Sequence, residues 1–217
     1  IIAVAAGLSA QAAETFGAFS IGETGFAPLR RQNGASFFSP TSMFVYLVSA
    51  NGERIVLRKA ARTGNGWHFT EGARSAELTV RSVSSERISL SLLGSGNDLR
   101  AIGFVIGADE ASSVIVPGGR NGVAFRTFDF SGQQRFTWPR RWEAPVVVLE
   151  SGRESIAVWT EDVSNRYRSC VLFGEKSVKC VAFETENYAP FSGKSSIASP
   201  QWNVEVFTGG YKTALAP

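Results

Sequence analysis

Acid–base chemistry in this chain would have to use its single histidine or its carboxylates. His68 could act as a general acid or base, but the segment Gly66-Trp67-His68-Phe69 has no cysteine, serine or carboxylate at a catalytic spacing. We therefore interpret His68 as a strand residue at a sheet surface. With 2 Cys and 1 His, the chain cannot assemble a Cys/His metal set. The sequence thus indicates no metal site and no cofactor.

Paired carboxylates are the second chemical possibility. Glycosidases hold two of them about 5–10 Å apart. The candidates are Glu150, Glu161, Asp162, Glu184 and Glu186, of which Glu150 and Glu161 come from neighbouring predicted strands and could approach each other. Acids at strand ends are common on protein surfaces, so we assign no catalytic pair. Glu161-Asp162 could contribute to a calcium site, but its spacing matches no calcium-loop motif. Because G-x-S-x-G, P-loop, G-x-G-x-x-G and zinc motifs are also absent, no complete catalytic centre is predicted.

Two tryptophans and two arginines gather in Trp138-Pro139-Arg140-Arg141-Trp142, at a break between predicted strands. An exposed tryptophan can stack on a sugar ring while arginine bonds to its hydroxyl groups. The alternative is that one or both tryptophans cap the core. We predict carbohydrate contact by Trp138, Arg140, Arg141 and Trp142.

The elements that would position these residues are β-strands. Apolar and polar residues alternate, and turn residues interrupt them every 8–12 positions, which is typical of a sandwich or barrel. Asn51-Gly52 is the strongest hairpin signal, and Ser84-Ser85 marks a second hairpin. No amphipathic helical window is present. We predict an all-β fold, a large antiparallel two-sheet sandwich, with strands over 43–48, 54–57, 77–81, 87–92, 102–106, 114–116, 123–130, 134–138, 146–150, 156–160, 166–173, 177–184 and 202–207.

The two cysteines flank a predicted turn at Gly174-Glu175-Lys176. If the turn is centred on Glu175, Cys170 lies opposite Cys180 and a cross-strand disulfide is possible. A register shift of one residue places the two thiols on opposite faces of the sheet and forbids the bond.

Compartment and domain limits follow from the ends of the chain and from its charge. Residues 1–12 are apolar and end in Ala10-Gln11-Ala12, which resembles the end of a secretory signal peptide. We therefore expect a secreted or periplasmic protein with one domain over 13–208 and no membrane span. A buried N-terminal strand or helix is the alternative for residues 1–12. The net charge is only +3 and the basic residues are scattered, which argues against nucleic acid as a partner.

Two C-terminal segments resemble the galactose-mutarotase-like β-supersandwich that precedes the catalytic (β/α)₈ barrel of several glycoside hydrolases. The first consists of Trp142–Glu150 followed by Ala157–Asp162. The second runs from Trp202-Asn203-Val204-Glu205-Val206-Phe207 to Ala214, although Gly210 and Tyr211 stand where Asp and Trp are usual. The resemblance implies that residues 209–217 begin a linker or helix into a barrel of the same chain. It also implies that catalysis takes place in that barrel.

The sequence leaves three functional hypotheses. The first is the non-catalytic N-terminal β-sandwich domain of an exported glycoside hydrolase acting on poly- or oligosaccharides, which supports the barrel and contributes a sugar-contacting loop. The second is a stand-alone carbohydrate-binding or adhesive module. The third is a mutarotase-like epimerase, which a single histidine makes hard to assemble.

Overall fold

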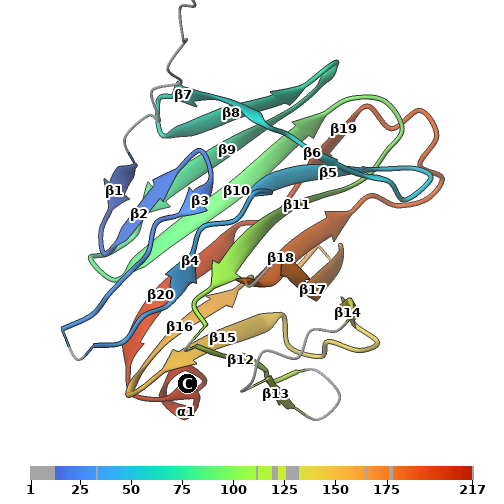
Figure 1. Ribbon diagram of the computed structural model, residues 1–217. Helices are drawn as coiled ribbons and strands as arrows, with labels where there is room; N and C mark the ends of the chain where they lie inside the picture. The colour runs from blue at the N-terminus through green and yellow to red at the C-terminus, as the bar shows by residue number, and fades with distance from the viewer. Residues whose placement is uncertain are drawn as a thin grey trace, which may run out of the picture.

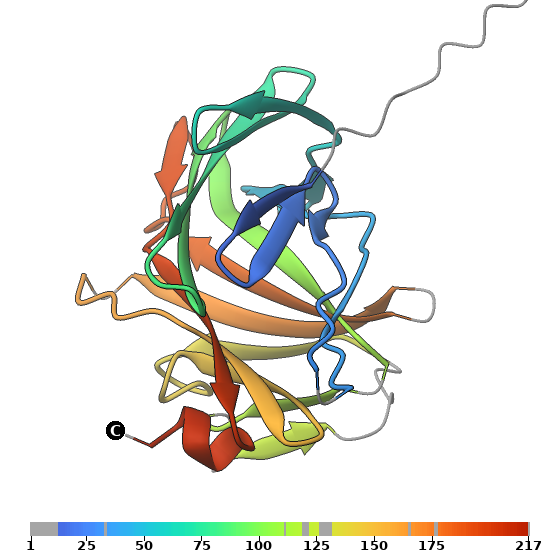
Figure 2. The same cartoon turned by 90° about the vertical axis from the view of Figure 1, so that its left-hand side faces the viewer.

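The computed structural model describes residues 13–32, 34–110, 112–118, 122–125, 132–164, 166–175 and 178–216. Within these ranges almost all regular structure is β-strand, and the one helix is α1 (Tyr211–Ala214). The strands form two large antiparallel sheets packed face to face and one small sheet (Figures 1 and 2). The predicted all-β antiparallel sandwich is confirmed.

The larger sheet contains ten strands among the described residues, and every pairing in it is antiparallel. β10 pairs with β20 through Arg87–Leu90 and with β19 through Leu93–Ser95. In spatial order the strands are β13 (Val123–Phe125), β12 (Ser113–Val116), β15 (Val146–Ser151), β16 (Glu154–Trp159), β20 (Trp202–Thr208), β10 (Arg87–Ser95), β9 (Arg74–Ser82), β8 (Gly66–Glu71) and β7 (Lys59–Thr63), with β19 (Ser196–Ala198) beside β10.

The second large sheet contains seven described strands. Its order is β14 (Gln134–Trp138), β17 (Tyr167–Glu175), β18 (Val178–Glu186), β11 (Leu99–Ala108), β5 (Val45–Ser49) and β6 (Arg54–Val56), with β4 (Phe38–Ser39) beside β11. The small sheet, β1 (Glu14–Phe16), β2 (Phe19–Gly22) and β3 (Gly25–Phe26), adds Phe19, Ile21 and Phe26 to the core. The β7–β8 hairpin and α1 lie at opposite ends of the sandwich (Figures 1 and 2).

The main core lies between the two large sheets because alternate residues of each strand point inward. The inner face of β20 carries Trp202, Val204 and Val206. Phe104 and Phe183 from the opposite sheet stack with ring centroids 5.1 Å apart, and Trp202 lies 5.1 Å from Phe183. Trp202 therefore joins the two sheets at the centre of the sandwich.

The predicted hairpins are confirmed, although the prediction missed several strands. β5 and β6 are joined at Asn51-Gly52, where Gly52 has φ +89°. β9 and β10 are joined around Ser84-Ser85, with Ser82 opposite Ile88. The missed strands β1–β4, β7, β8 and β19 are short or lie near sheet edges, where exposed and half-buried positions blur the apolar alternation. The predicted strand over 123–130 is observed for Val123–Phe125, and residues 126–130 lie outside the described ranges, as does the predicted signal-peptide segment 1–12.

The cross-strand disulfide that the sequence left possible is not formed. Cys170 pairs with Phe183 and Cys180 with Phe173, because the β17–β18 hairpin closes at Glu175 and Val178. This register places Cys170 in the main core and Cys180 on the outer face of the sheet. Both thiols are free and buried, and burial raises the pKa of each, that of Cys180 to about 12.

The β7–β8 turn provides a test of the strand packing. A Cβ atom on Gly66 would lie 1.7 Å from the backbone oxygen of Leu78, whereas one on Gly64 would meet nothing within 4 Å. We expect Gly66→Ala to lower the free energy of unfolding by about 1–3 kcal/mol and Gly64→Ala to change it by less than about 0.5 kcal/mol. Urea denaturation of both variants checks this, and equal effects would contradict the register of β8 on β9.

Candidate functional site: an arginine-rich pocket

The outer face of the seven-stranded sheet carries polar side chains where β14 lies beside β17 (Figure 1). Phe136 and Cys170 point into the core, so their neighbours Arg135, Thr137 and Ser169 point outward. The hydroxyl groups of Thr137 and Ser169 lie 3.3 Å apart on adjacent strands. The strand pairing thus gives this face a row of hydrogen-bonding groups.

A pocket of about 570 Å³ opens over this row. The volume falls in the range of about 300–1,000 Å³ typical of small-molecule sites. Four of the lining side chains are arginines, and one is a carboxylate. The lining residues are Arg100, Arg135, Arg140, Arg141, Thr137, Tyr167, Ser169 and Glu186. We call this cavity the arginine pocket.

Arg135, which forms one wall of the arginine pocket, pairs with a buried carboxylate. Glu184, with 4% of its side chain exposed, forms ion pairs with Arg135 and with Arg54. Its Oε1 also accepts a hydrogen bond of 2.7 Å from the Tyr46 hydroxyl. Burial, followed by the charge of Glu184, raises the pKa of Tyr46 well above its ordinary value, so Tyr46 remains a donor. These contacts hold Arg135 in place before any ligand binds.

The other arginines differ in how they are held. Arg100 Nε lies 3.3 Å from Glu186 Oε2, and its guanidinium group lies 5.3 Å from the ring centroid of Phe191. Arg140 and Arg141 are exposed, and their side chains form no hydrogen bond or ion pair with the described part of the chain. Two fixed and two unpaired guanidinium groups therefore face the same cavity.

The four residues predicted to contact sugar lie in different places in the structure. Arg140 and Arg141 line the arginine pocket. Trp138 shares the inward face of β14 with Phe136, and the Arg168 guanidinium lies 4.4 Å from its ring centroid. Trp142 is fully buried and stacks on Trp202 at 6.3 Å, while its Nε1 donates to the Val146 carbonyl at 3.2 Å. Trp142 therefore lies inside the core and Trp138 is half-buried at its edge, so of the four predicted residues the arginines are the two that line the pocket.

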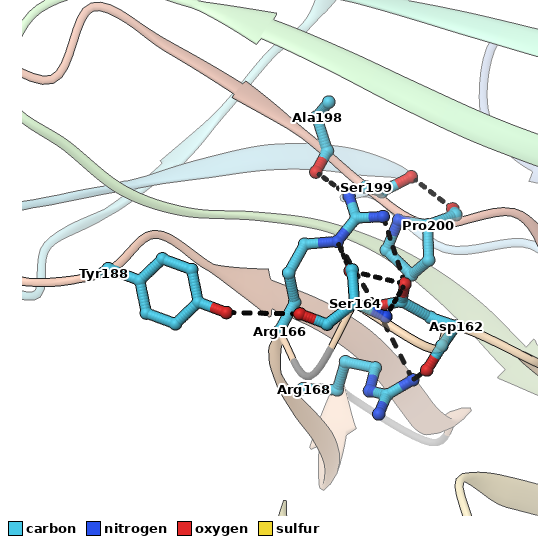
Figure 3. Close-up of polar contacts among 8 residues, drawn as sticks. All are labelled: Asp162, Ser164, Arg166, Arg168, Tyr188, Ala198, Ser199 and Pro200. Atoms are coloured by element: carbon cyan, nitrogen blue, oxygen red, sulfur yellow. Dashed lines mark hydrogen bonds and ion pairs between the residues drawn. The ribbon is translucent and has the colours of Figure 1, made fainter.

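A second polar cluster lies behind Trp138 and fixes the loop between β16 and β17 (Figure 3). Asp162, with 5% of its side chain exposed, lies 3.2 Å from Arg166 and 3.7 Å from Arg168. Arg166 also donates to the Ala198 carbonyl at 3.0 Å, and the Tyr188 hydroxyl donates to the Ser164 carbonyl at 3.3 Å. Burial would raise the pKa of Asp162, but hydrogen bonds from Ser164 and Arg166 outweigh it and hold the pKa below the ordinary value of 3.8. This cluster joins the loop to the crossover between the two sheets.

Glu150 and Glu161, the two carboxylates expected to approach each other, lie at different ends of the β15–β16 hairpin. Glu150 accepts a 2.7 Å hydrogen bond from the Tyr211 amide at the start of α1. Glu161 lies at the other end of the β15–β16 hairpin and accepts a 3.1 Å bond from Trp159 Nε1. His68 stands on β8 between Ala61 and Glu77, as expected for a sheet-surface residue. No three His, Cys, Asp or Glu side chains gather as metal ligands in the described ranges.

An apolar groove of about 350 Å³ occupies the outer face of the larger sheet beside α1. Trp159, Phe207 and Val146 supply its floor, and Ala214 and Leu215 form a side. Ile115, Val148 and Ala157 are buried beneath it. The helix α1 (Tyr211–Ala214), which borders the groove through Ala214, lies at the end of the sandwich where the described chain ends (Figure 1).

Sequence analysis missed Arg100, Arg135 and Tyr167, and it considered Glu186 only as a candidate for acid–base work. These four lining residues come from β14, β17, β18 and the start of β11, which are far apart in sequence. The alternation of β14 could have placed Arg135 and Thr137 on the face opposite Phe136. No local signal could have brought Arg100 to them, because that requires the order of strands in the sheet.

Comparison with known proteins identifies the fold alone. No protein-family model and no curated protein sequence matches the chain. An alpha-N-acetylgalactosaminidase, NagBb from Bifidobacterium bifidum in quadruple-mutant form, aligns with a TM-score of 0.53 and 10% identity over 90% of this chain and 36% of its own. A GH31 family sulfoquinovosidase from E. rectale aligns with a TM-score of 0.46 and 9% identity over 86% of this chain and 32% of its own. The chain thus spans about a third of these structures and has a β-sandwich fold similar to part of the first, a glycoside hydrolase.

Proposed function

We propose that this chain is a non-catalytic β-sandwich domain of an exported glycoside hydrolase that acts on poly- or oligosaccharides. The observation that carries the proposal is the fold similarity to the alpha-N-acetylgalactosaminidase, which extends over 90% of this chain and 36% of that enzyme. The remaining length of such an enzyme has room for a separate catalytic unit. In the proposal, that unit is a (β/α)₈ barrel of the same chain, and this domain is its galactose-mutarotase-like N-terminal neighbour.

Two surfaces support the proposal that this domain is non-catalytic and packs beside a separate catalytic barrel. The arginine pocket offers guanidinium and hydroxyl groups, which suit sugar recognition but supply no catalytic carboxylate pair. The apolar groove beside α1 suits the barrel, because α1 begins directly after β20, where the chain would continue into it. In this proposal the groove packs against the barrel, and the pocket adds a sugar-contacting surface.

Export is part of the same proposal. The apolar segment before residue 13 has the small residues of a signal-peptide cleavage site, which favours a secreted or periplasmic protein. In the described ranges, no helix has the length and apolarity that crossing a bilayer requires.

The test is to assay the chain and the product of its complete reading frame with a panel of fluorogenic glycosides. We expect turnover by the complete product and none by the 217-residue chain alone. Turnover by the chain alone would contradict the proposal, as would a reading frame that ends at codon 217. In that last case, binding to a glycan array would favour a stand-alone carbohydrate-binding or adhesive module. Sugar-anomer exchange, lost in His68→Ala, would favour an epimerase.

A further inference from the structure

Charge distinguishes the arginine pocket from a site for a neutral sugar. Four guanidinium groups face the single carboxylate of Glu186. A neutral saccharide offers hydroxyl groups, which neutral side chains and carboxylates can bind. Arginine is the residue whose planar pair of N–H groups matches a carboxylate or sulfate. The composition of the lining therefore points to an anionic ligand.

The pairing of the arginines gives them different roles. Arg135 is held by the buried Glu184, and Arg100 is held by Glu186. Their charges are partly neutralised, and they shape the wall of the pocket. Arg140 and Arg141 have no side-chain partner in the described part of the chain, so they can pair with an incoming anion without losing an existing ion pair. Most of the selectivity for charge should thus come from these two.

The remaining lining suits a saccharide. Tyr167 has a relative exposure of 50% and can lie against the apolar face of a sugar ring. Thr137 and Ser169 offer hydroxyl groups that both donate and accept hydrogen bonds. Nucleic acid fits less well, because it needs an extended basic surface, and the net charge of the whole chain is only +3.

We propose that the arginine pocket binds a saccharide that carries carboxylate or sulfate groups, with Arg140 and Arg141 as the residues that select for the charge. This inference rests on the proposed function, since it names the class of saccharide that the hydrolase would take. In the complex, each arginine would donate paired hydrogen bonds to an anionic group while Tyr167 packs on the ring.

Isothermal titration calorimetry on the 217-residue chain tests the inference. The probes are an oligogalacturonate, a sulfated galactan oligosaccharide and a neutral galacto-oligosaccharide of the same length. We expect at least one acidic probe to bind at least about tenfold more tightly than the neutral one, with an affinity that falls as salt rises. The probe that binds distinguishes a carboxylate from a sulfate ligand.

The variants locate the site. The double variant Arg140→Gln/Arg141→Gln should weaken binding of the acidic probe at least about tenfold. The matched control Arg81→Gln/Arg153→Gln removes two exposed arginines outside the pocket and should bind as the natural chain does. Thermal unfolding of both variants should match the natural chain, because none of these side chains is buried.

Four results would overturn the inference: equal binding of neutral and acidic probes, unchanged binding by the pocket variant, tighter binding of a single-stranded oligonucleotide, or no binding of both acidic probes. These outcomes leave the glycosidase assay unaffected. If the complete product cleaves neutral glycosides and the chain binds neither acidic probe, the proposed function stands and the anionic ligand is rejected.

Discussion

Replacing Trp202 by alanine is expected to lower the free energy of unfolding by about 3–5 kcal/mol. Trp202 is 1% exposed and lies on β20, the central strand of the larger sheet that also pairs with β10 and β16. Its ring contacts Phe104 and Phe183 of the opposite sheet at 6.0 and 5.1 Å, and it stacks on Trp142 at 6.3 Å. Alanine would leave a cavity between the sheets that neighbouring strands, held by their ladders, cannot close.

Urea denaturation followed by circular dichroism measures this loss. Val83→Ala, at a position 54% exposed, is the control and should change stability by less than about 0.5 kcal/mol. Trp202→Phe should retain part of the ring contacts and lose less than Trp202→Ala. A loss below about 1 kcal/mol for Trp202→Ala would mean that the two sheets do not meet at this residue.

Replacing Asp162 by asparagine is expected to cost about 3 kcal/mol of stability at neutral pH. The substitution keeps the size of the side chain and removes the charge that faces Arg166 and Arg168. Arg168 has only 2% of its side chain exposed and would remain charged without its carboxylate partner. Its stacking on Trp138 cannot replace that partner, so the end of the core and the β16–β17 loop should both loosen.

The effect of this substitution should depend on pH. The folded protein holds the pKa of Asp162 below the ordinary value of 3.8. The stability from its charge is therefore fully present above that ordinary value and is lost as pH falls through the folded pKa. The gap between the natural chain and Asp162→Asn should narrow as the solution is acidified below about pH 4.

A control variant and a double variant test the interaction between Asp162 and Arg168. Glu77→Ala removes an exposed carboxylate on β9 and should leave stability within about 0.5 kcal/mol of the natural chain. Arg168→Met combined with Asp162→Asn should lose less than the sum of the two single variants, because no unpaired charge stays buried. Strict additivity would show that Asp162 and Arg168 do not interact.

The sandwich could be predicted from sequence because its long central strands carry clean alternation. In β10 the inward residues are Ile88, Leu90 and Leu92, and in β20 they are Trp202, Val204 and Val206. The β17–β18 register could not be predicted, because Gly174 of the predicted turn pairs with Lys179 inside the ladder and Cys170 lies opposite Phe183, three residues beyond Cys180. That register separates Cys170 from Cys180.

Only the part of the candidate site that comes from one short sequence segment could be predicted. The two arginines between Trp138 and Trp142 are visible in sequence, and both line the pocket. The sequence could not show where the two tryptophans of this segment lie, because an aromatic residue near a strand break can either cap a core or bind a ligand. Trp142 is buried because the chain turns back over the end of the sandwich and places it on Trp202, a partner 60 residues away that only the tertiary structure provides.

The central claim, that the arginine pocket is the saccharide-recognising surface of this β-sandwich, can be tested most directly by NMR of the ¹⁵N-labelled chain. Arginine Nε–Hε resonances would be followed during titration with the oligogalacturonate and the sulfated galactan oligosaccharide. The account predicts that the resonances of Arg140 and Arg141 shift with at least one probe, while those of Arg81 and Arg153 stay in place. Shifts spread evenly over all surface arginines, or absent from Arg140 and Arg141, would contradict it.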